Sequence, residues 1–259
     1  MLRNDARRSA WIGVLTFAVL FAAWYVLTTL TQTISSGRFP APGETLDALR
    51  QIAGPGYADA RLYVHVLHSA ALVLEGFAAA TIIGVPLGLA MGWSRACEAF
   101  VNPAFLLIRP IPPLAWIPLA IVWLGLGDAA KVLVIWFAAF VPAVINSYSG
   151  VRSIEPHLVE AARMLGVSRT MLVREVLIPG AAPMIFTGLR LSLQACWTTL
   201  VAAELIGAIA GLGHVLYQAS LDLFPAMIVV GMAAVAVTAA VMTLLLGVIE
   251  RRAMPWRRS

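Results

Sequence analysis

Long apolar segments separated by short polar ones dominate this chain. A helix that crosses a bilayer needs about 20 predominantly apolar residues, and six segments of that kind can be placed. They cover residues 11–31, 66–92, 101–125, 130–150, 184–208 and 226–248. The pattern predicts an all-α polytopic membrane protein with six transmembrane helices.

The third apolar segment is rich in proline. Pro103, Pro110, Pro112, Pro113 and Pro118 all fall within it. Proline removes a main-chain donor and breaks helices, and irregular main chain is tolerated in a membrane only where protein or a wet cavity surrounds it. We expect this segment to be a broken span.

Composition and charge agree with a membrane protein and predict its orientation. Of the 259 residues, 61% are hydrophobic and 12% are charged, against about 25% charged in soluble proteins. Basic residues gather on the cytoplasmic side of membrane proteins. One side of the predicted spans carries Arg3, Arg7, Arg8, Arg95, Arg152, Arg163, Arg169, Arg174, Arg251, Arg252, Arg257 and Arg258, and the other carries Arg38, Arg50, Arg61 and Lys131. Both termini are therefore predicted to lie in the cytoplasm.

Three regions follow from this arrangement. Residues 1–65 comprise a cytoplasmic tail, the first span and an extracytoplasmic segment with a short surface helix near residues 46–52. Residues 66–250 are expected to form a core of spans two to six that includes the polar cytoplasmic loop 152–180. Residues 251–259 form a basic cytoplasmic tail.

The loop 152–180 has the pattern of two helices joined by a turn. Pro156 suits the first turn of a helix, Gly166 suits its end, and Ser168 can cap a second helix. We expect that second helix to end at Pro179, before the approach to the fifth span.

A helix-turn-helix alone leaves several functions open. A DNA-binding module is disfavoured, because spans tied to both ends keep it from the major groove. An amphipathic loop on anionic lipid headgroups suits the arginines. The first helix, however, carries the small residues Ala161, Ala162 and Gly166, which favour close approach to another protein.

The same residues carry a family resemblance. Glu160-Ala161-Ala162, then Gly166, then Val176-x-Ile178-Pro179 resembles the EAA loop of the permease subunits of ABC importers, in which Ile and Leu stand where Val176 and Ile178 stand here. Both departures are exchanges between apolar residues.

The resemblance implies a type I importer permease whose loop is a coupling helix seated in a groove of an ATPase. The complex would hold two ATP-binding subunits, two copies of the permease and a periplasmic substrate-binding protein, in the inner membrane of a bacterium. Ala161, Ala162 and Gly166 would touch the ATPase, Glu160 would fix the loop or pair with a basic ATPase residue, and Pro179 would complete the motif. The chain has no phosphate-binding loop, so ATP and Mg²⁺ would be used by the ATPase, with no cofactor on this chain.

Other stretches of the sequence indicate which subfamily of these permeases the chain resembles. Residues 109–119, 123–127 and 201–206 resemble the permeases of taurine, alkanesulfonate and nitrate importers, and residues 52–55 and 254–256 resemble the taurine permeases most. The implied substrate is taurine or another aliphatic sulfonate. Nitrate, bicarbonate and an aromatic carboxylate remain open alternatives.

Ionisable residues in the spans are candidates for the translocation pathway, because a charge in the bilayer must face a cavity or a partner. These are Glu75, Arg109, Arg190 and Glu204. Arg109 lies beside the broken segment that contains Pro112 and Trp116, and its guanidinium suits an anion, although it could equally snorkel or tie the broken main chain together. Glu204 is a candidate for gating or for a structural hydrogen bond.

Two further classes of function are weaker alternatives. A secondary transporter fits six spans and buried charges, but the coupling motif and the lack of a convincing inverted repeat argue against it. An intramembrane enzyme or metal site on His65, His68 and Glu75 lacks a convergent set of groups. Cys97 and Cys196 have no metal-ligand spacing, and we expect free thiols.

Overall fold

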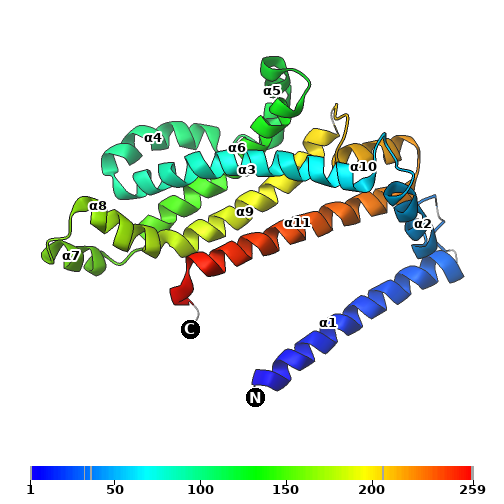
Figure 1. Ribbon diagram of the computed structural model, residues 1–259, viewed down its shortest axis with the longest axis horizontal. Coiled ribbons are helices and arrows are strands. Elements are labelled where there is room, and N and C mark those ends of the chain that lie inside the picture. Colours follow the sequence, from blue (N-terminus) through cyan, green and yellow to red (C-terminus); the bar gives the residue numbers. More distant parts are fainter. Residues whose placement is uncertain (1, 32, 36, 206, 258–259) are drawn as a thin grey trace.

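The computed structural model describes residues 2–31, 33–35, 37–205 and 207–257, and the described residues form helices and no strand (Figure 1). The long helices are α1 (Leu2–Tyr25, continued by the π-helical segment Val26–Leu30), α3 (Leu62–Trp93), α6 (Asp128–Arg152), α9 (Ile178–Glu204) and α11 (Pro225–Ala253). A 3₁₀ turn, Pro255–Arg257, follows α11. Ile206 and Arg258, which the sequence-based predictions include, lie outside the described residues.

The third apolar segment is a broken helix, as predicted. α4 (Arg95–Ile108) is separated by four residues from a 3₁₀ turn (Pro113–Trp116) and α5 (Ile117–Leu124), and the two halves are bent by 84°. Among the described residues, five unbroken helices are long and apolar enough to span a membrane, and the total is six if this bent pair is one span. This number agrees with the six predicted spans.

Close packing of α3 on α6 depends on small residues at every fourth position of α3. Gly76, Ala80, Gly84, Gly88 and Gly92 form this stripe. Helices in membranes approach closely where such residues meet, and a Cβ on Gly76 would lie 2.6 Å from Cγ2 of Ile135 on α6. α9 also packs closely on α6, where a Cβ on Gly188 would lie 2.6 Å from Cβ of Asn146.

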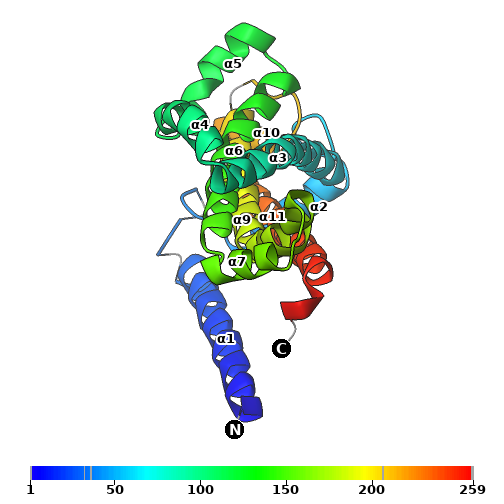
Figure 2. The ribbon, with the colours of Figure 1, turned by 90° about the vertical axis from the view of Figure 1, so that its left-hand side faces the viewer.

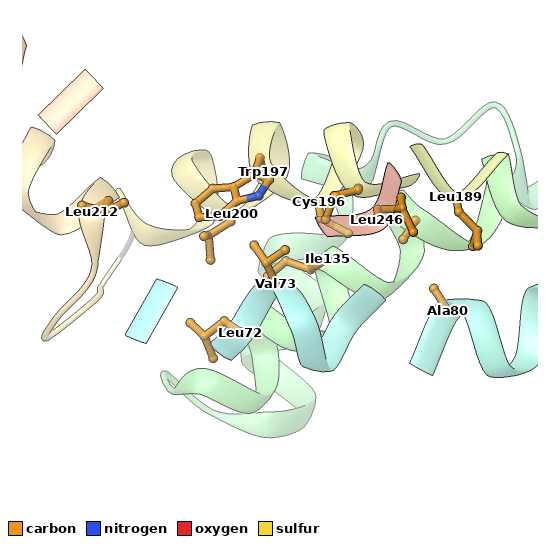
Figure 3. Close-up of a cluster of buried hydrophobic side chains, with 12 residues drawn as sticks. Leu72, Val73, Ala80, Ile135, Leu189, Cys196, Trp197, Leu200, Leu212 and Leu246 are labelled. Carbon is orange, nitrogen blue, oxygen red and sulfur yellow. The ribbon is translucent and has the colours of Figure 1, made fainter. Parts of the chain in front are cut away.

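The main buried cluster joins these three helices to α10 (Leu212–Leu221) and α11. Figure 3 shows Val73 of α3 facing Ile135 of α6, with Trp197 and Leu200 of α9 above them. A second cluster packs α2 (Pro42–Ala53) on α10 and α11 through Ala48 and Ile52. The surface helix predicted near residues 46–52 is therefore present, whereas α10 was not predicted.

The predicted loop 152–180 contains α7 (Pro156–Met164), α8 (Arg169–Leu172) and a π-helical segment, Val173–Leu177. The expected interruption at Pro179 is wrong. The helix runs on into α9, because Pro179 occupies the first turn of α9, where proline is tolerated. The fifth span therefore begins at Arg169 rather than at residue 184.

The elements are arranged along one long axis. Figure 1 shows α7 and α8 at one end of the bundle and α2 and α10 at the other. In Figures 1 and 2, α1 stands away from the other spans, and the indole N–H of Trp24, near its end, donates to the carbonyl of Pro40, at 2.8 Å. The side chains of α1 from Trp11 onward are mostly exposed, so this span is available to lipid or to another protein.

Candidate functional site

In the loop 152–180, which the resemblance makes the candidate coupling loop and which is called the coupling loop below, the turn between α7 and α8 is the one that the sequence predicts. Gly166 has φ +73°, a conformation that favours glycine, and it ends α7. The hydroxyl of Ser168 accepts from the main-chain N–H of Met171 at 3.3 Å and caps α8. The turn between the two helices is thus defined by these two residues.

The predicted contact residues do not all face outward. Glu160, Ala161 and Gly166 are exposed, whereas Ala162 is 9% exposed. Two large apolar side chains that are not among the predicted contact residues, Met164 and Leu165, are 83% and 82% exposed at the tip of the loop. An apolar tip next to small residues is the kind of surface that a protein partner covers.

The coupling loop is fastened to the spans by a small apolar cluster. Val151 at the end of α6 packs with Leu177, the last residue of the π-helical segment, and with Ala181 at the start of α9, and Ile154 and Trp93 lie against them. A Cβ on Gly180 would lie 3.1 Å from Cδ1 of Ile154. Because side chains packed this closely transmit displacement, a displacement of the loop would be transmitted to α6 and α9.

The predicted pathway residues of the broken span are surface residues of the single chain. Arg109 caps the end of α4 at the bend and is exposed, and its side chain has no hydrogen bond or ion pair with any described residue. Pro112 is also exposed, and it precedes the 3₁₀ turn. Trp116 stacks on Phe137 of α6, with ring centroids 4.1 Å apart. The broken span therefore exposes the guanidinium of Arg109 at its bend, while Trp116 is anchored on α6.

Glu204, at the end of the bundle opposite the coupling loop, is completely buried. Its carboxylate accepts one hydrogen bond from the hydroxyl of Ser69 on α3 and another from the main-chain N–H of Gly213 on α10, both at 2.7 Å. A carboxylate at the start of a helix satisfies a free N–H and complements the helix dipole. The predicted hydrogen-bonded structural acid is present, and Arg109 is not its partner.

Side chains of α3 hold the neighbouring amides of the same turn. The N–H of Gly211 donates to Nδ1 of His65 at 3.1 Å, and the N–H of Leu212 donates to the hydroxyl of Ser69 at 2.8 Å. His65 is buried, and its Nε2 lies 3.0 Å from the carbonyl oxygen of Tyr57. His65 is therefore a structural residue of this turn.

Three charged or polar side chains extend the cluster to α6. Nε2 of His68 lies 3.1 Å from Asp128, whose other carboxylate oxygen accepts from the ammonium group of Lys131 at 2.9 Å. Nδ1 of His68 is 4.0 Å from the Glu204 carboxylate. In the part of the chain that the structure describes, no group of three or more His, Cys, Asp or Glu side chains is placed to hold a metal ion.

Next to this cluster, on α10, burial and then the neighbouring His65 lower the pKa of His214.

The remaining predicted intramembrane charges are separate from this cluster. Arg190 of α9 pairs with Glu250 of α11. Glu75 is exposed on α3 and is not gathered with His65 or His68 into a common site. Of the four ionisable residues predicted to matter, only Glu204 lies in a buried polar cluster.

The sequence predictions missed Ser69, Asp128 and the turn at residues 211–213. The only local signal was Gly211-Leu212-Gly213, because a Cβ on either glycine would collide with Glu204. Ser69 is 135 residues away from Glu204, and no short pattern connects the two.

Comparison with known proteins identifies relatives along nearly the whole chain. A family profile described as "Binding-protein-dependent transport system inner membrane component" matches residues 84–258. The taurine transport system permease protein TauC of Escherichia coli (strain K12) is 39% identical over 250 residues, which cover 96% of this chain and 90% of that protein. The putative aliphatic sulfonates transport permease protein SsuC of Bacillus subtilis (strain 168) is 30% identical over 98% of this chain and 90% of its own length.

A more partial match and a solved structure complete the comparison. The bicarbonate transport system permease protein CmpB of Synechococcus elongatus is 36% identical but covers 63% of this chain and 59% of that protein. A chain of the MetNI methionine ABC transporter, in an inward-facing conformation, superposes with a TM-score of 0.61 over 75% of this chain and 95% of that one, at 22% identity. That likeness establishes a shared type I importer permease fold.

Proposed function

The chain belongs to the family of binding-protein-dependent transport system inner membrane components, and from that premise we propose that the ATP-driven importer of which it is the permease subunit carries taurine or another aliphatic sulfonate. The similarity to TauC, which extends over 96% of the chain, is the observation that supports this substrate. The relative named for bicarbonate transport matches a smaller part of the chain.

The proposed complex contains two copies of this permease, two ATP-binding subunits and a periplasmic substrate-binding protein, in the inner membrane of a bacterium. The exposed tip of the coupling loop, with Met164 and Leu165, supports docking of an ATPase. The exposed surface of α1 supports contact with a second copy or with lipid. The ATPase would bind and hydrolyse ATP with Mg²⁺, and this chain would catalyse no reaction.

In this mechanism the permease converts movement of the ATPase into alternating access. A helix held in a groove moves as a rigid body with its partner, and the cluster around Val151 and Leu177 would pass that movement to the spans. The exposed guanidinium of Arg109 would attract the sulfonate, with Pro112 and Trp116 shaping the bend that follows it in the chain and Glu204 acting at the end of the bundle opposite the coupling loop.

The proposal is tested with the complete transporter in proteoliposomes. Uptake of labelled taurine is measured with ATP inside, against competing ethanesulfonate, nitrate, bicarbonate and benzoate, and the ligand of the binding protein is measured by calorimetry. We expect taurine or ethanesulfonate to be carried best. Preferential uptake of nitrate, bicarbonate or benzoate would show that the preferred anion, and not a sulfonate, is the substrate. Uptake that needs no ATP would indicate a secondary transporter.

Variants of the coupling loop test the ATPase contact separately. Gly166→Asp and Glu160→Arg should abolish uptake by weakening ATPase association while the permease still inserts in the membrane. Normal uptake in both variants would refute the assignment of this loop.

A further inference from the structure

The coupling loop and the Glu204 cluster are joined by one uninterrupted helical span. The helix runs from Arg169 through the π-helical segment to Glu204, a length of 36 residues. At about 1.5 Å per residue this is about 54 Å. One end belongs to the coupling loop and the other carries Glu204, so an axial displacement of α8 meets no break in the helix before it reaches that carboxylate.

At its far end this span is bonded to a different helix. Glu204 accepts from the N–H of Gly213, and Ser69 of α3 bridges the two by donating to Glu204 and accepting from Leu212. All four residues are buried. The first turn of α10 is consequently held by side chains of α9 and α3.

Contact between Glu204 and this turn leaves no free space. A Cβ on Gly213 would lie 2.6 Å from Cβ of Glu204 and 2.7 Å from the carbonyl oxygen of Val201, and a Cβ on Gly211 would overlap the carboxylate. Protein interiors packed to this density transmit strain rather than absorb it. Movement of Glu204 must therefore displace the start of α10 or break its hydrogen bonds.

We propose that Glu204 is a positioning residue that carries the axial movement of α9 to the first turn of α10, and so links the coupling loop to the opposite end of the bundle. The inference rests on the proposed function, because it requires an ATPase that moves the loop. If Glu204 were only structural, its substitution would change the stability and assembly of the transporter. In the proposed role, its substitution changes the amount of substrate transported for each ATP hydrolysed.

The test measures taurine imported per ATP hydrolysed by the complete transporter, with its ATPase and binding protein, in proteoliposomes. Glu204→Ala should leave ATP hydrolysis and lower this ratio about tenfold, equivalent to about 1.4 kcal/mol of coupling free energy. Glu204→Gln keeps an oxygen that can accept from Gly213, and should lower the ratio less.

Ser192→Ala is the matched control. The buried hydroxyl of Ser192 on α9 donates to the carbonyl of Ala139 on α6 at 2.7 Å, so this variant also removes a buried hydrogen bond of α9, but one that does not involve α10. The ratio should stay at its wild-type value. An equal loss in Ser192→Ala and Glu204→Ala would overturn the proposal, because general loosening of α9 would then be the cause.

If Glu204→Ala does not assemble with the ATPase, Ser69→Ala tests the proposed role of Glu204 instead. It removes the bridge to Leu212 and keeps the contact of Glu204 with Gly213, so we expect a smaller loss of the ratio. If Ser69→Ala, or a Glu204→Ala transporter that assembles, imports as much taurine per ATP as the wild type, the inference is overturned and the proposed function stands. A wild-type transporter that imports nothing with ATP would overturn the proposed function itself.

Discussion

The carboxylate of Glu204 occupies the space that a side chain on Gly211 would need. A Cβ on Gly211 would overlap Oε1 of Glu204 and lie 2.5 Å from its Cδ, and Gly211 has φ +126°. The residue is therefore a glycine for two reasons, its main-chain conformation and the close approach of Glu204.

Gly211→Ala should destabilise the protein more than strain alone would. A residue with a side chain in such a conformation costs about 1–3 kcal/mol, and displacement of Glu204 adds the loss of its buried hydrogen bonds. We expect a lower midpoint of thermal unfolding in detergent and reduced uptake.

Gly125→Ala separates the two causes. Gly125 also has a positive φ, +79°, but a Cβ there meets nothing within 4 Å. The midpoint of thermal unfolding should therefore fall less in Gly125→Ala than in Gly211→Ala. Equal falls would show that the contact with Glu204 contributes nothing.

Patterns that extend over a few turns were predictable from the sequence, and contacts between distant segments were not. The six spans follow from the length of apolar runs, and the turn of the coupling loop follows from Gly166 and Ser168. Each of these signals is contained in the segment that it describes.

The errors have physical reasons of the same kind. Pro179 was expected to interrupt a helix, yet proline fits the first turn of α9 and the π-helical segment before it keeps the helix continuous. The short helix α10 is held by His65, Ser69 and Glu204 from two other helices, so its own sequence carries little of the information that places it.

Leu165→Glu should weaken binding of the ATPase. Leu165 is 82% exposed at the tip of the coupling loop, and in an apolar interface a buried carboxylate without a partner is costly. We expect the amount of ATPase that copurifies with the permease to fall several-fold, with normal amounts of permease in the membrane.

Ile209→Glu is the control for that variant. Ile209 is 86% exposed but follows α9 at the opposite end of the bundle. Copurification of the ATPase should stay normal. The docking assignment of Leu165 fails if both variants lose the ATPase or if neither does.

Arg109→Ala should reduce transport without dissociating the ATPase. The exposed guanidinium at the bend of the broken span has no partner among the described residues and is free to meet an anion. Arg109→Lys keeps the charge but not the planar pair of donors, and should retain part of the activity. The concentration dependence of uptake checks both variants, and unchanged kinetics in Arg109→Ala would leave Arg109 with a structural role.

Gly88 and Gly84 of α3 should respond differently to alanine. A Cβ on Gly88 would overlap the carbonyl oxygen of Val144 and lie 2.8 Å from Cβ of Ser147, whereas a Cβ on Gly84 would lie 3.1 Å from Cβ of Ala143. Alanine favours a helix over glycine by about 1 kcal/mol, but overpacking costs about 1–3 kcal/mol. Gly88→Ala should lower the thermal unfolding midpoint in detergent, and Gly84→Ala should leave it nearly unchanged. Equal midpoints for the two variants would mean that α6 accommodates a methyl group beside Val144 as easily as beside Ala143. Close approach at Gly88 would then not be what stabilises the packing of α3 on α6.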